Sequence, residues 1–469
     1  MSKYIKTLVA IMTIAILGGC KVSKDVQLPR TAIPEYFRNA ETTDSLSISN
    51  QTTADFFPER ELKNLIDTAL IKNYDLQIAI KNLGSTGQLL RQARLGNLPQ
   101  LNLQITGSSS NPSDNSLNGL SASEFLKTSH VEDFNTNLEL TWEADIWGKI
   151  KSRKQEALAT YLQTEEARKA VQTQLIASIA QGYYRLLMMD AQMAIAKKNL
   201  ALSDSTLIIV KLQFNAGQVS LLAVQQAKAQ QLVSAQLIPK LQQEIVVQEN
   251  ALSMLTGRVP GTIDRRTSLD ETFVSGRLSV GYPSAMVSKR PDVKSAELSL
   301  TIANAKVGVA KAGMYPSINI TATGGLNTFK ASNWFNIPAS LFGVVAGGIT
   351  QPLLQKRQLK TEYELAKIER EKAVIKFRQS VLTAVTEVSD ELVKIEKLKE
   401  QYDISKDKVS TLQQAVKNAN LLFASGMATY LEVITAQSNS LQSELELTSI
   451  KTAQLNAAVE LYRTLGGGL

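Results

Sequence analysis

The chain is poor in the residues on which most enzymes and disulfide-bonded domains depend. Its 469 residues include one cysteine and one histidine, His130. A disulfide bond needs two cysteines, and a structural zinc site usually takes four cysteine or histidine ligands. A Ser-His-Asp mechanism would have to use His130, and no glycine-rich loop ends in Gly-Lys-Ser or Gly-Lys-Thr. We therefore expect no catalytic residues, no metal site and no cofactor.

Proline and glycine are also scarce. The 12 prolines and 25 glycines are few for this length and favour long, uninterrupted elements. Because 44% of the residues are hydrophobic, the sequence does not predict disorder. The formal net charge is +8, but lysine and arginine are interspersed with aspartate and glutamate, as on solvated helix faces. We therefore expect no nucleic-acid partner.

The single cysteine, Cys20, follows a segment typical of an exported protein. A basic start precedes an apolar stretch over residues 7–16 that is too short to span a bilayer. The following Leu17-Gly18-Gly19-Cys20 is similar to a bacterial lipobox, in which the cysteine carries the lipid. We predict a signal peptide at residues 1–19, a lipid anchor at Cys20 and a polar, extended tether at residues 20–57.

Most of the chain is one unit present twice. Lys72-Asn73-Tyr74-Asp75 aligns with Lys289-Arg290-Pro291-Asp292 at an offset of 217, and Phe214-Asn215-Ala216-Gly217 aligns with Phe423-Ala424-Ser425-Gly426 at an offset of 209. The smaller second offset means that the first copy has eight extra residues, which we place in a loop that contains His130.

The duplication defines the expected organisation of the chain. We predict a first repeat at residues 58–257, a linker at 258–283, a second repeat at 284–466 and a short tail at 467–469. Each repeat begins with a segment of helical composition, at residues 59–96 and 284–313. Both segments end in a glycine followed three residues later by proline, which is a helix stop signal.

In the segments that follow, apolar and polar residues alternate, so the hydrophobic pattern has a period of two residues. Leu101, Leu103 and Ile105 alternate with polar residues, and the alternation between residues 137 and 146 has Glu139, Glu143 and Asp145 at polar positions. The second copy repeats the pattern at residues 317–322 and, more weakly, at 341–350. This alternation predicts four strands with one polar face, on which the three carboxylates would lie.

Beyond the strands, apolar residues recur every seven positions. In the second copy the series runs from Val374 to Val416, and subtracting 209 gives a matching series in the first copy. We predict coiled-coil helices at residues 150–213 and 357–422, each about 95 Å long at 1.5 Å per residue. Gly217 and Gly426 would then reverse the chain into two return helices.

Four strands with one polar face cannot close a barrel alone, and an open strand edge cannot face lipid. A dimer would supply eight strands and a trimer twelve, and an eight-stranded barrel is filled by its own side chains. A trimer is therefore favoured. The expected fold class is mainly α with a transmembrane β portion and a two-fold internal repeat, forming a trimeric 12-stranded β-barrel continuous with a 12-helix α-barrel.

Four sequence motifs occur in a specific order along this duplicated chain. In chain order they are Trp142 to Gly148, Lys289-Arg290-Pro291-Asp292-Val293 with Ala296-Glu297-Leu298, Tyr430-Leu431 with Ala436-Gln437, and the ending from Leu461 to Gly468. In these motifs, from about residue 27 onward, the chain resembles the TolC-like outer-membrane factors in their lipoprotein branch. The resemblance implies a homotrimeric exit duct in the outer membrane, with a long periplasmic extension. It also implies a periplasmic adaptor and an inner-membrane pump, usually proton-driven, as partners.

The resemblance also implies working residues. Leu431 matches a hydrophobic constriction at the periplasmic aperture, Glu432 and Thr435 fall where relatives carry acidic rings, and Ser438 falls where some carry a basic partner. A solvated glutamate on a helix face is an equal alternative for Glu432.

The two turns between the long and return helices are the expected adaptor-docking tips, represented by Gly217, Gln218, Gly426 and Ala428. Glycine in a tight reversal also has a purely structural explanation. Two other functions stay open from the sequence: a type I protein-secretion duct, and an envelope coiled-coil lipoprotein with a structural role. The sequence does not identify whether the substrate of the expected efflux duct is a drug, a dye or a metal ion.

Overall fold

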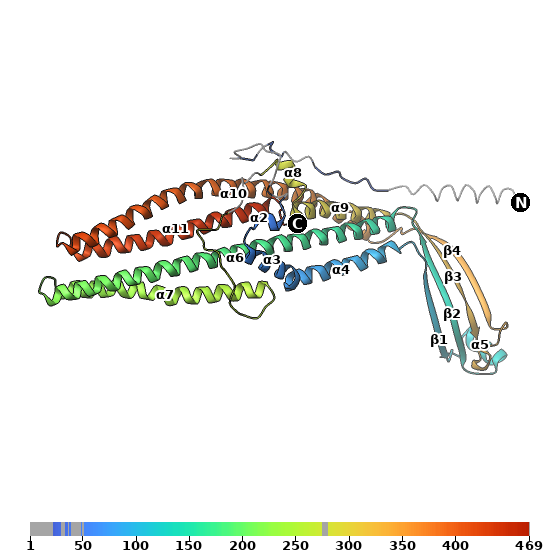
Figure 1. Ribbon diagram of the computed structural model, residues 1–469. Coiled ribbons are helices and arrows are strands. Elements are labelled where there is room, and N and C mark those ends of the chain that lie inside the picture. The colour runs from blue at the N-terminus through green and yellow to red at the C-terminus, as the bar shows by residue number, and fades with distance from the viewer. Residues whose placement is uncertain are drawn as a thin grey trace. The chain divides into compact units, whose positions relative to one another are not determined.

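The computed structural model describes residues 22–29, 33–35, 37, 38, 48, 51–273 and 280–468. The predicted signal peptide and Cys20 lie outside these residues. The chain divides into two compact units. Unit 1 comprises Met1–Pro29, Ser85–Leu162 and Glu297–Ile375, and unit 2 comprises Arg30–Gly84, Gln163–Ala296 and Lys376–Leu469. Both repeats contribute to each unit (Figure 1).

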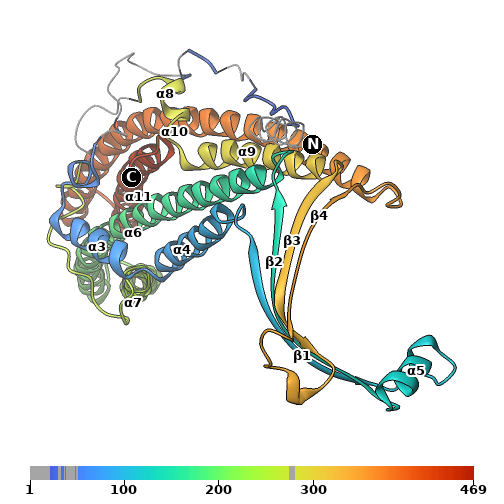
Figure 2. The same cartoon turned by 90° about the vertical axis from the view of Figure 1, so that its right-hand side faces the viewer.

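Unit 1 contains one antiparallel sheet of four strands in the order β1-β2-β3-β4 (Figure 2). The strands are β1 (Gln100–Ser110), β2 (Val131–Ala144), β3 (Ser317–Thr328) and β4 (Leu341–Thr350). Pairing of β2 with β3 joins the two repeats into a single sheet. The four predicted strands are therefore present, although β2 ends at Ala144 instead of continuing to residue 146 as the alternation suggested.

The connection between β1 and β2 is longer than that between β3 and β4. It spans residues 111–130 and contains α5 (Leu117–Ser121) and the π-helical turn η2 (Ala122–Leu126), whereas the second connection spans only residues 329–340. The difference is the eight extra residues predicted for the first copy, and His130 lies in this loop as expected.

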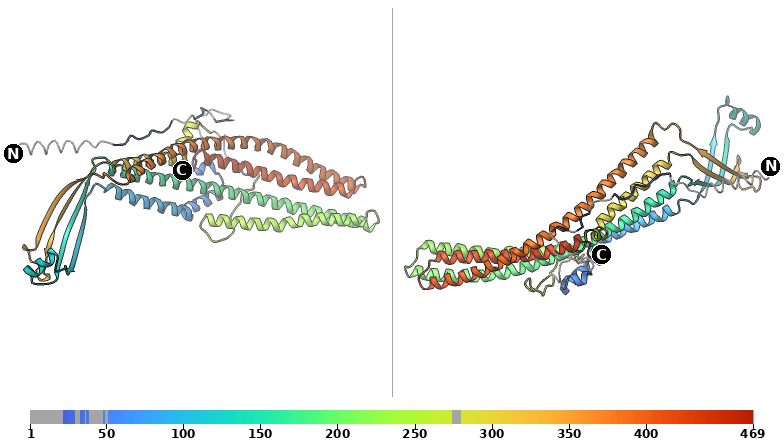
Figure 3. Two further views of the ribbon diagram at one scale, coloured as in Figure 1. Left: turned by 180° about the vertical axis from the view of Figure 1, so that it is seen from behind. Right: turned by 90° about the horizontal axis from the view of Figure 1, so that it is seen from above.

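The remaining elements are helices. Two helices of 67 residues, α6 (Lys149–Asn215) and α10 (Gln358–Ala424), are each followed by a return helix of 35 residues, α7 (Leu221–Leu255) and α11 (Tyr430–Thr464). Figure 3 shows the two hairpins side by side. The heptad seam is confirmed, because Ile179, Leu186, Val381 and Val388 are buried. Within the described part of the chain, no helix has the length and hydropathy needed to cross a membrane.

The single helices expected at residues 59–96 and 284–313 are each broken in two. The first becomes α3 (Arg60–Lys72) and α4 (Tyr74–Arg94), and the second becomes α8 (Pro283–Val287) and α9 (Pro291–Ala312). At the first break the side-chain oxygen of Asn73 accepts a hydrogen bond from the backbone N–H of Leu76 at 2.9 Å. Asn73 therefore starts a new helix in the middle of an apparently continuous pattern.

The core of unit 2 includes segments that the sequence analysis assigned to a tether and a linker. Phe37, Ile48, Phe56 and Phe57 are buried, and the Phe56 ring stacks on Tyr462 with centroids 4.1 Å apart. Residues 53–56 form the short helix α2 (Thr53–Phe56). The prediction of a free tether over residues 20–57 is thus wrong for these positions, because their aromatic and apolar side chains are removed from water.

The linker at residues 258–283 also packs onto the core, through Ile263, Leu269 and Val280. Arg265 in this linker donates hydrogen bonds to Asp190 on α6 and Glu249 on α7. These contacts fasten the linker to both helices of the first hairpin.

Candidate functional site

The sheet of unit 1 has one apolar and one polar face. Directly opposed residues of an antiparallel sheet share a face. Leu101 lies opposite Leu140, Leu140 opposite Ala322, and Ala322 opposite Val345, which makes one face apolar across all four strands. On the other face Asn102 lies opposite Glu139, and Glu139 opposite Thr323.

Both faces of the sheet are open in the single chain. Leu101, Leu103 and Ile105 on the apolar face of β1 are each 63% exposed, and every residue of β1 is exposed. Leaving such a surface in water is unfavourable, so an apolar face of this extent marks a contact with lipid or another protein. The outer edges of β1 and β4 pair with no strand among the described residues.

Two of the three predicted lumen carboxylates lie on the polar face. Glu139 accepts a hydrogen bond from Gln104 at 3.2 Å, and Glu143 forms an ion pair with Lys149 at 2.8 Å. None of the residues in the four described strands is lysine, arginine or histidine, so the sheet itself carries only acidic charge.

Asp145 does not belong to that face. It follows the end of β2, and its carboxylate accepts hydrogen bonds from the backbone N–H groups of Ile150 at 2.9 Å and Lys151 at 2.8 Å. These are unpaired donors of the first turn of α6, so Asp145 caps that helix. Its assignment to the lumen is corrected because the alternating pattern ends one residue before it.

The hairpin tips in unit 2 adopt the reversals predicted from glycine. Gly217 and Gly426 have φ values of +71° and +76°. Gln218 beside the first glycine is exposed, and Ala428 near the second is half-buried. The backbone N–H of Ala428 donates to the Leu422 carbonyl at 3.2 Å, which closes the second turn.

The two tips pack against each other through a small apolar cluster. Its buried members are Leu207, Val210, Ala223, Ala227, Phe423 and Val433. Near the tips, the Tyr430 hydroxyl donates to Gln226 at 2.6 Å, and the buried Gln437 amide donates to Thr206 at 2.9 Å, so hydrogen bonds also join the two hairpins there. Sequence analysis did not find these contacts, since their partners lie more than 200 residues apart.

The four predicted aperture residues lie in the first turns of α11. Leu431, Glu432 and Thr435 are exposed and Ser438 is half-buried. The Glu432 carboxylate accepts a hydrogen bond from the backbone N–H of Thr429 at 2.6 Å, as part of a capping box that starts the helix. The Thr-x-x-Glu pattern was the signal for this role.

The Arg290 motif forms a buried joint in unit 2. Arg290 is 4% exposed, and its guanidinium donates to Asp292 at 2.7 Å, to Glu387 at 2.7 Å and to the Thr464 carbonyl at 3.1 Å. Burial opposes the charge of Arg290, but these bonds outweigh it and raise its pKa. Burial likewise acts to raise the pKa of Asp292, and the bonds to Arg290 lower it overall.

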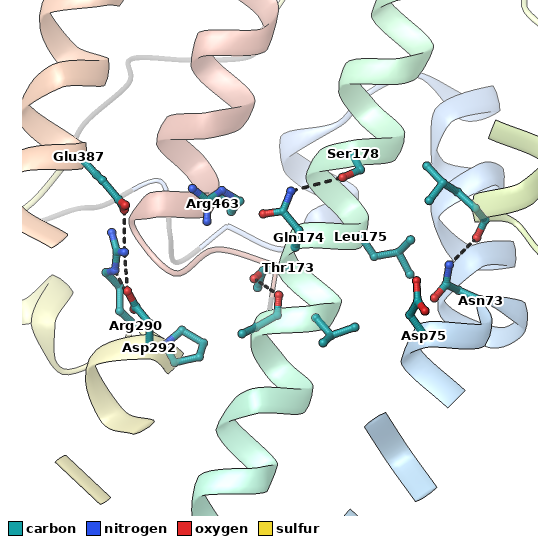
Figure 4. A pocket seen from close by; sticks show the side chains of 14 residues that line it. Asn73, Asp75, Thr173, Gln174, Leu175, Ser178, Arg290, Asp292, Glu387 and Arg463 are labelled. Atoms are coloured by element: carbon teal, nitrogen blue, oxygen red, sulfur yellow. Dashed lines mark hydrogen bonds and ion pairs between the residues drawn. The ribbon is translucent and has the colours of Figure 1, made fainter. Parts of the chain in front are cut away.

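A cavity of about 610 Å³ lies beside this joint, with Arg290, Asp292 and Glu387 on one side and Gln174, Ser178 and Asn73 among its other lining residues (Figure 4). All three guanidinium nitrogens are hydrogen-bonded to protein groups. The arrangement therefore connects α9, α10 and the end of α11 and leaves no guanidinium nitrogen unbonded.

The first repeat has an equivalent contact at the end of its return helix, but a neutral side chain makes it. Asn73, equivalent to Arg290, donates to the Leu255 carbonyl at the end of α7 at 2.9 Å. Gly257 follows that helix with φ +63°, and a Cβ there would lie 2.5 Å from the Lys72 carbonyl oxygen. Gly466 has φ +82° and lies against Lys289 in the second repeat. The glycine that ends each repeat is thus required by backbone conformation.

No group of three or more histidine, cysteine, aspartate or glutamate side chains suited to a metal ion occurs among the described residues. A two-faced sheet whose outer edges pair with no described strand, in a chain that also forms paired helical hairpins, is the arrangement expected of a duct-type membrane protein.

Comparison with known proteins gives the family. The sequence profile described as outer membrane efflux protein matches residues 65–258 and 282–467, one match for each repeat. The chain therefore belongs to the outer membrane efflux protein family. It is an exit duct of the outer membrane, and the resemblance seen in its motifs is confirmed.

Individual relatives match over nearly their whole length. The cation efflux system protein CusC of Escherichia coli strain K12 is 28% identical over 457 residues, covering 96% of this chain and 97% of that protein. The solvent efflux pump outer membrane protein SrpC of Pseudomonas putida is 29% identical over 463 residues, covering 97% and 96%.

Solved structures share the fold. A crystal structure of CusC gives a TM-score of 0.85 at 27% identity, over 96% of this chain and 100% of that one. The open-state MtrE outer membrane channel of Neisseria gonorrhoeae gives 0.84 at 24% identity, over 96% and 99%. These matches confirm the fold class expected from the sequence for the single chain.

Proposed function

We propose that three copies of the chain form one passive exit duct. Each copy contributes four strands to a 12-stranded barrel and its helices to a 12-helix tube. The observation that supports this is the open sheet, with two exposed faces and two unpaired edges. In lipid every strand edge must be paired, and pairing β4 of one copy with β1 of the next satisfies all edges.

The two faces then have different surroundings. The apolar face contacts lipid, and the polar face lines water. Strands of 10 to 14 residues suit a bilayer, which needs about 9–11 residues per tilted strand. Glu139 and Glu143 lie at the lumen, and Glu143 is partly neutralised by Lys149.

We assign the periplasmic aperture of the duct to the start of α11. Leu431 forms the hydrophobic constriction, with Glu432, Thr435 and Ser438 around it. The Glu432 charge is held close to the helix start by its capping bond to Thr429, so three copies would place their carboxylates at a fixed height.

The hairpin tips are the docking surface for a periplasmic adaptor, which links the duct to an inner-membrane pump. The exposed turns at Gly217 and Gly426 support this assignment. Replacing Gln218 or Ala428 with arginine should abolish efflux in cells while trimers still form. Normal efflux in both variants would refute the docking role.

The lipid anchor at Cys20 fixes the mature chain to the membrane in addition to the sheet. The duct carries small molecules and needs no catalysis of its own. The related proteins CusC and SrpC are named for the efflux of cations and of solvents, respectively. This chain has a similar sequence identity to both, so the identities leave both substrate classes open.

Conductance in planar bilayers tests the duct directly. Purified, reconstituted protein should give discrete, stable conductance steps, because a water-filled lumen carries ions. A structural lipoprotein without a lumen would give none, and a silent bilayer containing verified, inserted protein would refute the proposal.

A further inference from the structure

The turn that joins β4 to α10 has an unusual backbone. Lys356 and Arg357 have φ values of +45° and +68°, a region that residues with side chains rarely adopt. At the offset of 209 that relates the repeats, the position of Arg357 is Gly148, which has φ +72°. The first repeat uses glycine for this conformation, whereas the second holds an arginine in it.

The strained turn exposes both apolar and basic side chains. Leu353 is 86% exposed and Leu354 is 95% exposed, and Lys356 and Arg357 follow them in the exposed part of the chain. Non-glycine residues in this conformation are retained where the surrounding function requires them. The combination of exposed leucines with cations is typical of a segment at a membrane surface.

The neighbouring helix ends of unit 1 carry more cations at the same end of the sheet (Figure 2). We call six residues the basic collar: Arg91, Arg94, Lys151, Lys154, Lys356 and Arg357. All six are exposed, and none forms an ion pair with a carboxylate of the described residues. The collar therefore presents cations that have no carboxylate partner among the described residues.

Aromatic side chains mark the same level. Trp147 stacks on Tyr315 with ring centroids 4.9 Å apart, and Trp142 lies on the apolar face of β2. Tryptophan and tyrosine are enriched where a membrane protein meets the headgroups. The helix end also has acidic residues, but Glu143 is paired with Lys149 and Asp145 caps α6. At the loop end, Lys127 and Lys330 are accompanied by Asp114, Glu124 and Asp133.

We propose that the basic collar binds the phosphate groups of anionic phospholipids in the leaflet at the helix end of the sheet. Phosphate accepts hydrogen bonds from lysine and arginine, and clusters of such residues next to a membrane-spanning segment select anionic headgroups. The apolar face that begins beside the collar places these headgroups within reach. The inference rests on the proposed membrane position of the sheet.

Tryptophan quenching by brominated lipids tests the proposal. The full mature chain is reconstituted in vesicles as a Trp334→Phe variant, so that only Trp142 and Trp147 report, both at the helix end. The indole N–H of Trp334 has no hydrogen-bond partner among the described residues, so the replacement loses no bond seen there. Brominated phosphatidylglycerol is compared with brominated phosphatidylcholine. Quenching should favour phosphatidylglycerol, by on the order of fivefold in association constant for each cation engaged.

Glycine variants separate charge from backbone strain. Lys356→Gly with Arg357→Gly removes two collar charges and allows the positive φ, so the preference should fall several-fold while the melting temperature stays the same or rises. The matched control is Lys127→Gly, which relieves the same conformation at the loop end, with φ +56°, and should leave the preference unchanged.

Added salt gives a second readout that needs no further substitution, since 1 M salt should abolish the preference of the Trp334→Phe protein. Equal quenching of the Trp334→Phe protein by both lipids, or an unchanged preference in the double glycine variant, would overturn this inference alone. No quenching by either lipid would contradict the membrane position of the sheet and therefore the proposed function as well.

Discussion

The two repeats fold alike but differ in chemistry at equivalent positions. Asn73 and Arg290 both donate to the last carbonyls of a return helix, yet only Arg290 carries a charge and two carboxylate partners. Gly148 and Arg357 share a left-handed backbone conformation, yet only the glycine suits it. The two copies thus share backbone geometry at these positions, while at the Asn73–Arg290 pair only the second copy has ionic contacts. Substitutions made in matched pairs can measure each difference.

The largest difference in stability between matched variants should appear at the buried joint, between Arg290→Ala and Asn73→Ala. Arg290→Ala leaves Asp292 and the Thr464 carbonyl without their partner, and should lower the free energy of unfolding by roughly 2–3 kcal/mol. Partial exposure of the two carboxylates keeps the loss below that of a fully buried pair. Asn73→Ala removes neutral hydrogen bonds and should cost about 1 kcal/mol. Denaturant unfolding of the detergent-solubilised protein measures both, and equal losses would contradict the comparison.

The loss of stability caused by alanine should differ less between the two glycines that end the repeats, Gly257 and Gly466. Both have positive φ, so alanine at either position should cost roughly 1–2 kcal/mol. Only at Gly257 would the new Cβ also approach a backbone oxygen to 2.5 Å, while at Gly466 the nearest atoms are at 3.4 Å. Gly257→Ala should therefore lower the melting temperature more than Gly466→Ala. The opposite order would show that the two joints are not packed as described.

The return helices should differ in function more than in stability. Leu431→Ala widens the proposed constriction and should raise channel conductance or antibiotic influx. The matched control is Leu222→Ala at the equivalent position of the first repeat, where the side chain is 57% exposed, and there both values should stay as in the parent protein. Unchanged values for Leu431→Ala in both assays would remove this residue from the aperture.

The smallest effect should be a pH dependence of the Arg290–Asp292 contact in the second repeat. The pKa of Asp292 is lowered, burial being outweighed by the bonds to Arg290, so its carboxylate form is favoured in the folded protein. This stabilisation is complete above the ordinary aspartate pKa of about 3.9 and is lost as the pH falls through the lower, folded-state value. Asp292→Asn should destabilise at pH 7 and have little effect near pH 2. A difference that persists at low pH would argue against the ion pair.

Periodic features of the fold could be predicted from the sequence, because alternation and heptad spacing follow from the geometry of strands and helices. The four strands, the two long helices and the eight-residue insertion all appear where expected. The structure breaks two predicted helices. At the first break a single N-cap residue, Asn73, outweighs the surrounding pattern, and at the second a new helix begins at Pro291.

Contacts between distant residues could not be predicted in the same way. The bond from Arg290 to Thr464 joins residues 174 positions apart, and the burial of Phe57 depends on a core built from both repeats. Two helix caps, in contrast, have local sequence patterns from which they could have been predicted. Glu432 follows Thr429 in a capping-box pattern, and Asp145 lies just ahead of a helix start. The capping role replaces the lumen assignment of Asp145, whereas the aperture assignment of Glu432 stays a prediction.

The central claim is that three copies close the open sheet of one chain into a duct. The mass of the purified mature protein in detergent, measured by native mass spectrometry after the detergent is stripped, tests it most directly. The account predicts a single species with three times the mass of the lipidated chain. A monomer, or a dimer, as the stable membrane-extracted species would contradict it.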